Sequence, residues 1–134
     1  MGDMGTASRW LERSLRLGQK LGLQREVLMT IRVSGEVHRL AGEWETAYAL
    51  LTQALADSTR LDQYEAGLAH MSLAELFVAA SHPKGTESFL TLDEACDHLR
   101  QAVAIFEALP AKRELAKARL MAASVELPSR HAGQ

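Results

Sequence analysis

Apolar residues return along the chain at spacings of three and four, which is the period of an α-helix. Three segments share one frame: Ala7-x-x-x-Leu11-x-x-Ser14-Leu15, Ala47-x-x-x-Leu51-x-x-Ala54-Leu55 and Ala95-x-x-x-Leu99-x-x-Ala102-Val103. The pattern predicts an all-α chain with no strand. The six expected helices span about 4–20, 24–41, 44–60, 63–81, 92–108 and 111–127.

A second frame alternates with the first. It reads Ile31-x-x-Ser34-Gly35-x-x-His38, His70-x-x-Leu73-Ala74-x-x-Phe77 and Ala118-x-x-Met121-Ala122-x-x-Val125. The offsets agree between markers, since Ala47 follows Ala7 by 40 residues and Ala95 follows Ala47 by 48. Shared offsets of this kind indicate an internal helical repeat.

Small residues in the frames predict close helix packing. Gly35 stands in the middle of a predicted helix, where glycine costs about 1 kcal/mol relative to alanine. That cost is understandable if a neighbouring helix leaves no room for a side chain. Gly42 stands between two predicted helices, where a glycine commonly ends the first of them.

The spacing of Gly35, Gly42, Ala47, Leu51 and Ala54 resembles the tetratricopeptide repeat, with a unit of 40 residues in place of the usual length of about 34. The resemblance implies a right-handed α-solenoid of antiparallel helix hairpins. Longer units of this kind look like those of animal adaptor proteins and of bacterial signal-responsive regulators that carry an ATPase module.

On this basis the chain is expected to form a single domain over residues 1–134. Its predicted parts are a half-repeat at 4–21, a hairpin at 24–60, a hairpin at 63–108 with a loop insertion at 82–91, and a half-repeat at 111–127. We expect Pro128 to end the last helix, because proline disrupts a helix interior.

The amino-acid composition narrows the classes of function that the protein is expected to have. Lys and Arg number 15 against 17 Asp and Glu, so a role in binding nucleic acid directly is not indicated. Cys96 is the only cysteine, which excludes an internal disulfide. No apolar run approaches the roughly 20 residues of a membrane span. A cytoplasmic protein without membrane contact is the expectation.

The first helices of such repeats line a concave face, and the resemblance therefore implies a groove for a partner peptide or helix. The predicted groove residues are Met29, Arg32, Glu36, Arg39, Leu68, Met71, Glu75, Val78, Arg119 and Glu126. The alternative for Met71 and Val78 is that both pack against neighbouring helices.

Candidate chemistry is sparse. Glu94 and His98 are one helical turn apart, but two ligands are too few for a metal site, and a surface salt-bridged histidine is the favoured interpretation. His70 is expected to pack between helices. Arg9, Arg13, Arg16 and Lys20 form a basic stripe that either meets an acidic partner or, as we favour, is a solvated face. No catalytic residues, metal or cofactor are predicted, and an enzyme is not expected.

The sequence therefore predicts a protein–protein interaction scaffold or adaptor. The alternative is the sensor fragment of a larger signal-responsive bacterial regulator with an ATPase or DNA-binding module. The last apolar frame has no following helix to cover it, so a homodimer through uncapped ends is also expected.

Overall fold

The computed structural model describes residues 2–80 and 92–132. The helices are α1 (Gly2–Leu21), α2 (Gln24–Leu40), α3 (Trp44–Leu61), α4 (Gln63–Ala80), α5 (Leu92–Glu107) and α6 (Lys112–Ala132). The described ranges contain no strand. The all-helical prediction is confirmed, with eleven of the twelve predicted helix ends placed to within two residues. The predicted loop insertion at 82–91 lies outside the described residues.

The exception among the helix ends is the last one, because α6 continues through Pro128 to Ala132. The prediction that Pro128 ends the helix is wrong. A proline removes the hydrogen bond to the carbonyl four residues before it, which belongs to Ser124, while later residues can still bond. Ser124 is exposed, so water can satisfy its carbonyl.

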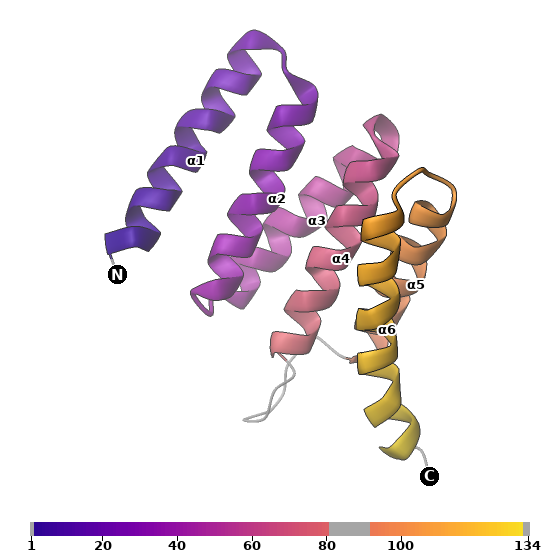
Figure 1. Ribbon diagram of the computed structural model, residues 1–134. Coiled ribbons are helices and arrows are strands. Elements are labelled where there is room, and N and C mark those ends of the chain that lie inside the picture. Colours follow the sequence, from indigo (N-terminus) through magenta and orange to yellow (C-terminus); the bar gives the residue numbers. More distant parts are fainter. Residues whose placement is uncertain (1, 81–91, 133–134) are drawn as a thin grey trace.

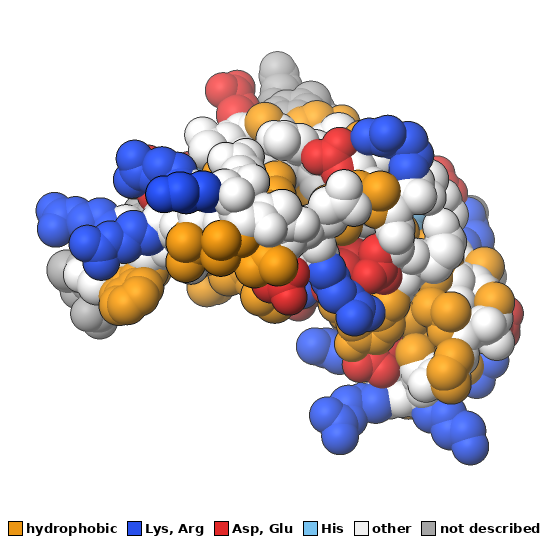
Figure 2. All heavy atoms as spheres, turned by 90° about the horizontal axis from the view of Figure 1, so that it is seen from above, with side chains coloured by type: hydrophobic (Ala, Val, Ile, Leu, Met, Phe, Trp, Pro, Cys, Tyr) orange, Lys and Arg blue, Asp and Glu red, His pale blue; other side chains and the backbone are white. Residues whose placement is uncertain are grey.

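The helices pack in chain order. Each helix contacts the next, and α2 also contacts α4. Figure 1 shows α1 and α6 at opposite ends of the row, with α2, α4 and α6 in front and α3 and α5 behind them. Seen from above, the molecule curves around a hollow (Figure 2). Helices α2, α4 and α6 thus lie on the same side of the arch.

Two glycines permit the closest helix contacts. A Cβ atom added to Gly35 in α2 would lie 2.6 Å from Cγ of Leu51 in α3. A Cβ atom on Gly67 in α4 would lie 2.6 Å from Cζ of Phe106 in α5. The close packing predicted at Gly35 is confirmed. Gly42 has the positive φ of 78° that a glycine adopts readily at a helix end.

The core follows these helix pairs in two clusters. One joins α3, α4 and α5 through Leu51, Leu73, Phe77 and Leu99, none more than 1% exposed. The other joins α4, α5 and α6 around Phe106. The first cluster is built largely from the frames that the sequence repeats, whereas Met71, Phe106 and Ala111 of the second lie outside those frames.

The position of α6 agrees with the predicted repeat. α6 begins 49 residues after α4, within one residue of the offset of 48 that the sequence frames give. The offset of 48 pairs His70 with Ala118 and Phe77 with Val125, and all four residues are buried.

The packing of α6 corrects the expected uncovered end. The frame of Ala118, Met121, Ala122 and Val125 was expected to lie exposed, but it packs against α4 and α5. The face of α6 that no described helix covers carries Leu120 instead, which is 72% exposed.

None of the described helices is long and apolar enough to cross a membrane.

Candidate partner-binding groove

A cleft of about 290 Å³ opens between α2, α4 and α6. Its walls are formed by Arg39 from α2, by Glu75, Val78 and Ala79 from α4, and by Met121, Ser124 and Val125 from α6. Apolar side chains and one charge of each sign therefore converge from three helices. This combination is typical of a peptide-binding surface, where apolar contacts provide affinity and a few polar groups fix orientation.

The two charged groups of the cleft are partly removed from water. Burial raises the pKa of the Glu75 carboxyl, and the nearby Arg39 guanidinium acts in the opposite direction. The Nε–H group of Arg39 is buried and has no hydrogen-bond partner. A buried donor without a partner is costly in free energy.

Elsewhere between α2 and α4, the polar side chains already satisfy one another. Nε of Arg32 donates to Oε1 of Glu65 at 3.3 Å, and a second nitrogen of Arg32 lies 3.7 Å from Oε2 of Glu36. The hydroxyl of Ser72 donates to Glu36 at 2.5 Å. The side chains of Arg32 and Glu65 are 15% and 8% exposed. This network holds α2 against α4 and leaves few groups free for a partner.

The predicted groove residues therefore divide into three groups. Arg39, Glu75 and Val78 come together in the cleft. Arg32 and Glu36 lie beside it in the interhelical network. Leu68 and Met71 pack inward against the cluster around Phe106, and Met71 is only 5% exposed.

The remaining predicted residues lie elsewhere. Met29 is exposed on α2 but does not line the cleft. Arg119 bonds Glu107 of α5 at 2.9 Å. The side chain of Glu126 lies outside the described residues. Arg119 was predicted on the concave face, and its ion pair with Glu107 directs it toward α5.

Sequence reasoning missed the α6 wall of the cleft. Met121 and Val125 were assigned to the frame that was expected to lie uncovered, and Ser124 was not considered. Ser124 follows Met121 by three residues and therefore lies on the same side of the helix, which is the sequence signal that could have found it.

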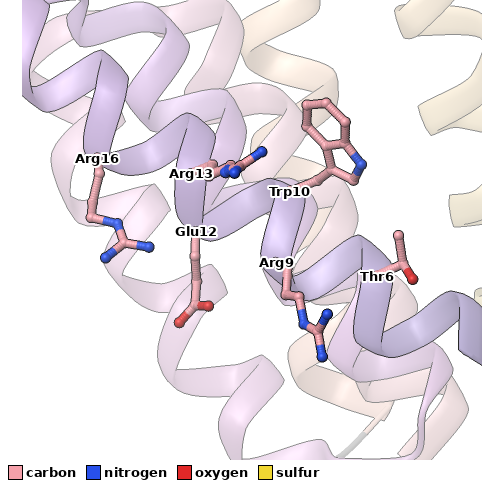
Figure 3. Close-up of a pocket in the computed structure, with 6 residues that line it drawn as sticks. All are labelled: Thr6, Arg9, Trp10, Glu12, Arg13 and Arg16. Atoms are coloured by element: carbon pink, nitrogen blue, oxygen red, sulfur yellow. The ribbon is translucent and has the colours of Figure 1, made fainter.

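A larger depression of about 400 Å³ lies along α1, and all six residues that line it belong to that helix: Thr6, Arg9, Trp10, Glu12, Arg13 and Arg16. Figure 3 shows these side chains spread along the helix rather than directed at a common point. A surface with walls from one helix encloses little of a ligand, so the cleft at Arg39 is the better binding site despite its smaller volume.

His70 and His98, for which no chemical role was expected, form a pair. Nδ1 of His70 and Nδ1 of His98 lie 2.8 Å apart, and the ring of His98 stacks on Phe77 with centroids 5.5 Å apart. His70 packs between helices as expected. The interpretation of His98 as a surface salt-bridged residue is wrong, because the side chain turns inward to α4.

The pair is held in its neutral form. Burial, and next the charge of His98, lower the pKa of His70 to about 4, and burial also lowers the pKa of His98. Glu94 and Asp97 oppose that second shift. Within the described residues, no group of three or more His, Cys, Asp or Glu side chains could hold a metal ion.

Comparison of the sequence with known protein families and with curated proteins finds no match.

Proposed function

We propose that the chain is a tetratricopeptide-like, right-handed α-solenoid that acts as a protein–protein interaction scaffold and binds a partner peptide in the cleft between α2, α4 and α6. The resemblance of the repeat frames supports the architecture. The curvature of the arch around its hollow supports a groove of this kind (Figure 2).

The observation that carries the proposal is the convergence of Arg39, Glu75 and apolar side chains from three helices in one cleft. A carbonyl or carboxylate oxygen of a peptide would accept from Arg39, while the Glu75 carboxylate accepts a peptide N–H. Val78, Met121 and Val125 would then contact apolar side chains of the same peptide. Main-chain groups and side chains of a peptide are thus both matched by the cleft.

The charged groups of the cleft are suited to binding a peptide rather than to catalysis. Glu75 is the only carboxyl that lines it, and no nucleophile with an adjacent base accompanies it among the described lining residues.

The proposal is tested with peptides selected from a random library against the whole protein and measured by fluorescence anisotropy. Val78→Asp places a charge among the apolar walls, and Arg39→Met removes the donor. We expect each change to weaken binding about tenfold or more. The matched control is Arg100→Met, an exposed arginine on α5 that bonds Asp97, and it should bind as the unmodified protein does. Equal affinity in all three variants would contradict a site in this cleft.

A further inference from the structure

α6 presents an apolar face that no described helix covers. Ala116, Leu120 and Ala123 are all exposed and lie on one side of the helix, because they are spaced by four and three residues. Leu120 is 72% exposed, the largest value among the large apolar side chains described as exposed. Such a face commonly marks an interaction surface.

The same residue pattern is buried twice elsewhere in the chain. Ala47-x-x-x-Leu51-x-x-Ala54 in α3 and Ala95-x-x-x-Leu99-x-x-Ala102 in α5 have the spacing of Ala116-x-x-x-Leu120-x-x-Ala123. All six residues of those two copies are at most 1% exposed. The small residues allow a neighbouring helix to approach closely, and the leucine fills the contact. The pattern on α6 is therefore suited to pack against a helix.

The position of the face agrees with its pattern. The opposite side of α6 packs against the two core clusters through Ala118, Met121, Ala122 and Val125. Ala116, Leu120 and Ala123 lie on the side of the helix away from those contacts, and all three are exposed.

The charged residues beside this face indicate which kind of helix would fit on it. Lys112 and Arg119 lie along one edge of the apolar face, and Arg113 and Lys117 lie along the other, all four exposed. Arg119 bonds Glu107 but keeps 59% of its side chain exposed. Basic residues on both edges attract acidic residues on both edges of a docking helix.

We propose that this face of α6 docks an amphipathic helix of another protein whose apolar stripe is flanked by Asp or Glu. The surface is separate from the cleft at Arg39. A second copy of the chain fits poorly, because pairing α6 with α6 would bring equal charges together. Docking on the outer face of α1 meets the same repulsion, since Arg9, Arg13, Arg16 and Lys20 are exposed there.

The probes are two synthetic helical peptides with the same leucine stripe, one flanked by Glu and the other by Lys. Anisotropy is measured with the full chain, with Leu120→Glu and with Leu40→Glu. Leu40 is a matched control because it is 70% exposed on a different helix. Circular dichroism should be the same for all three proteins, since both leucines are at the surface.

We expect the Glu-flanked peptide to bind the unmodified protein and the Leu40→Glu variant equally, and Leu120→Glu about tenfold or more weakly. The Lys-flanked peptide should bind about tenfold or more weakly to all three. Absence of saturable binding by the Glu-flanked peptide, or equal affinity for Leu120→Glu, would overturn the proposal. Dimerisation in sedimentation that Leu120→Glu abolishes would assign the face to a second copy and overturn it as well.

Discussion

At the scale of single residues, the His70–His98 pair shows how a neutral polar contact is maintained between helices. One imidazole must donate from Nδ1–H and the other must accept, so protonation of both rings is incompatible with the 2.8 Å separation. The apolar surroundings, including the stacked ring of Phe77, disfavour the charged forms.

The pair predicts a loss of stability in acid. The pKa of His70 is lowered to about 4 in the folded protein, below the value near 6.5 of the unfolded chain. Above pH 6.5, His70 is neutral in both the folded and the unfolded chain, so it costs no stability. As the pH drops from 6.5 towards 4, the free energy of unfolding falls because the unfolded chain binds protons more readily. After allowance for solvent screening, we expect this loss to be about 1–2 kcal/mol.

Urea unfolding at pH 7 and at pH 5 measures this contribution in the unmodified protein and in the double variant His70→Leu/His98→Leu. Carboxyl titration affects both proteins, so the difference between them isolates the pair. The variant should lose less stability between the two pH values. An equal loss in both proteins would show that the pair does not govern the acid response.

At the scale of helices, the repeat frames were sufficient to predict which segments are helical and to find most of the first core cluster. Gly35 and Ala47 mark the α2–α3 contact directly in the sequence, because small residues inside helices allow two backbones to approach closely. The packing of the last frame was not predictable in this way. It depends on how α6 docks on two earlier helices, α4 and α5.

The glycine contact predicts an unusual result for Gly35→Ala. Alanine normally raises the stability of a helix interior by about 1 kcal/mol, but here the new Cβ would lie 2.6 Å from Leu51. We expect a net destabilisation of about 1–3 kcal/mol, measured by urea unfolding. Gly5→Ala in α1 is the control, since nothing lies within 4 Å of its Cβ, and it should not destabilise the protein. A neutral Gly35→Ala variant would mean that α3 moves away at little cost.

At the scale of the whole molecule, the arch combines a largely apolar cleft that carries one charge of each sign with two basic ends. The exposed faces of α1 and α6 both carry four Lys or Arg side chains, while the formal net charge is only −2. Figure 2 shows Lys and Arg side chains gathered at both ends of the arch. Repulsion between equal ends favours partners of a different kind over copies of the same chain.

The candidate site was predictable only in part, because a groove between helices depends on how neighbouring helices are rotated. Arg39, Glu75 and Val78 were found from the groove that the resemblance to the tetratricopeptide repeat implies. The α6 wall required the docking of α6 on the earlier helices, and the burial of Met71 required its packing against Phe106.

Peptide binding in the cleft between α2, α4 and α6 is tested most directly by NMR. ¹⁵N-labelled protein is titrated with a library-selected peptide, and the backbone amide signals are followed through the titration. We expect the largest changes in chemical shift to cluster at Arg39, Glu75, Val78 and Met121. Changes concentrated instead on the outward faces of α3 and α5, around Arg60 and Arg100, would contradict binding in this cleft.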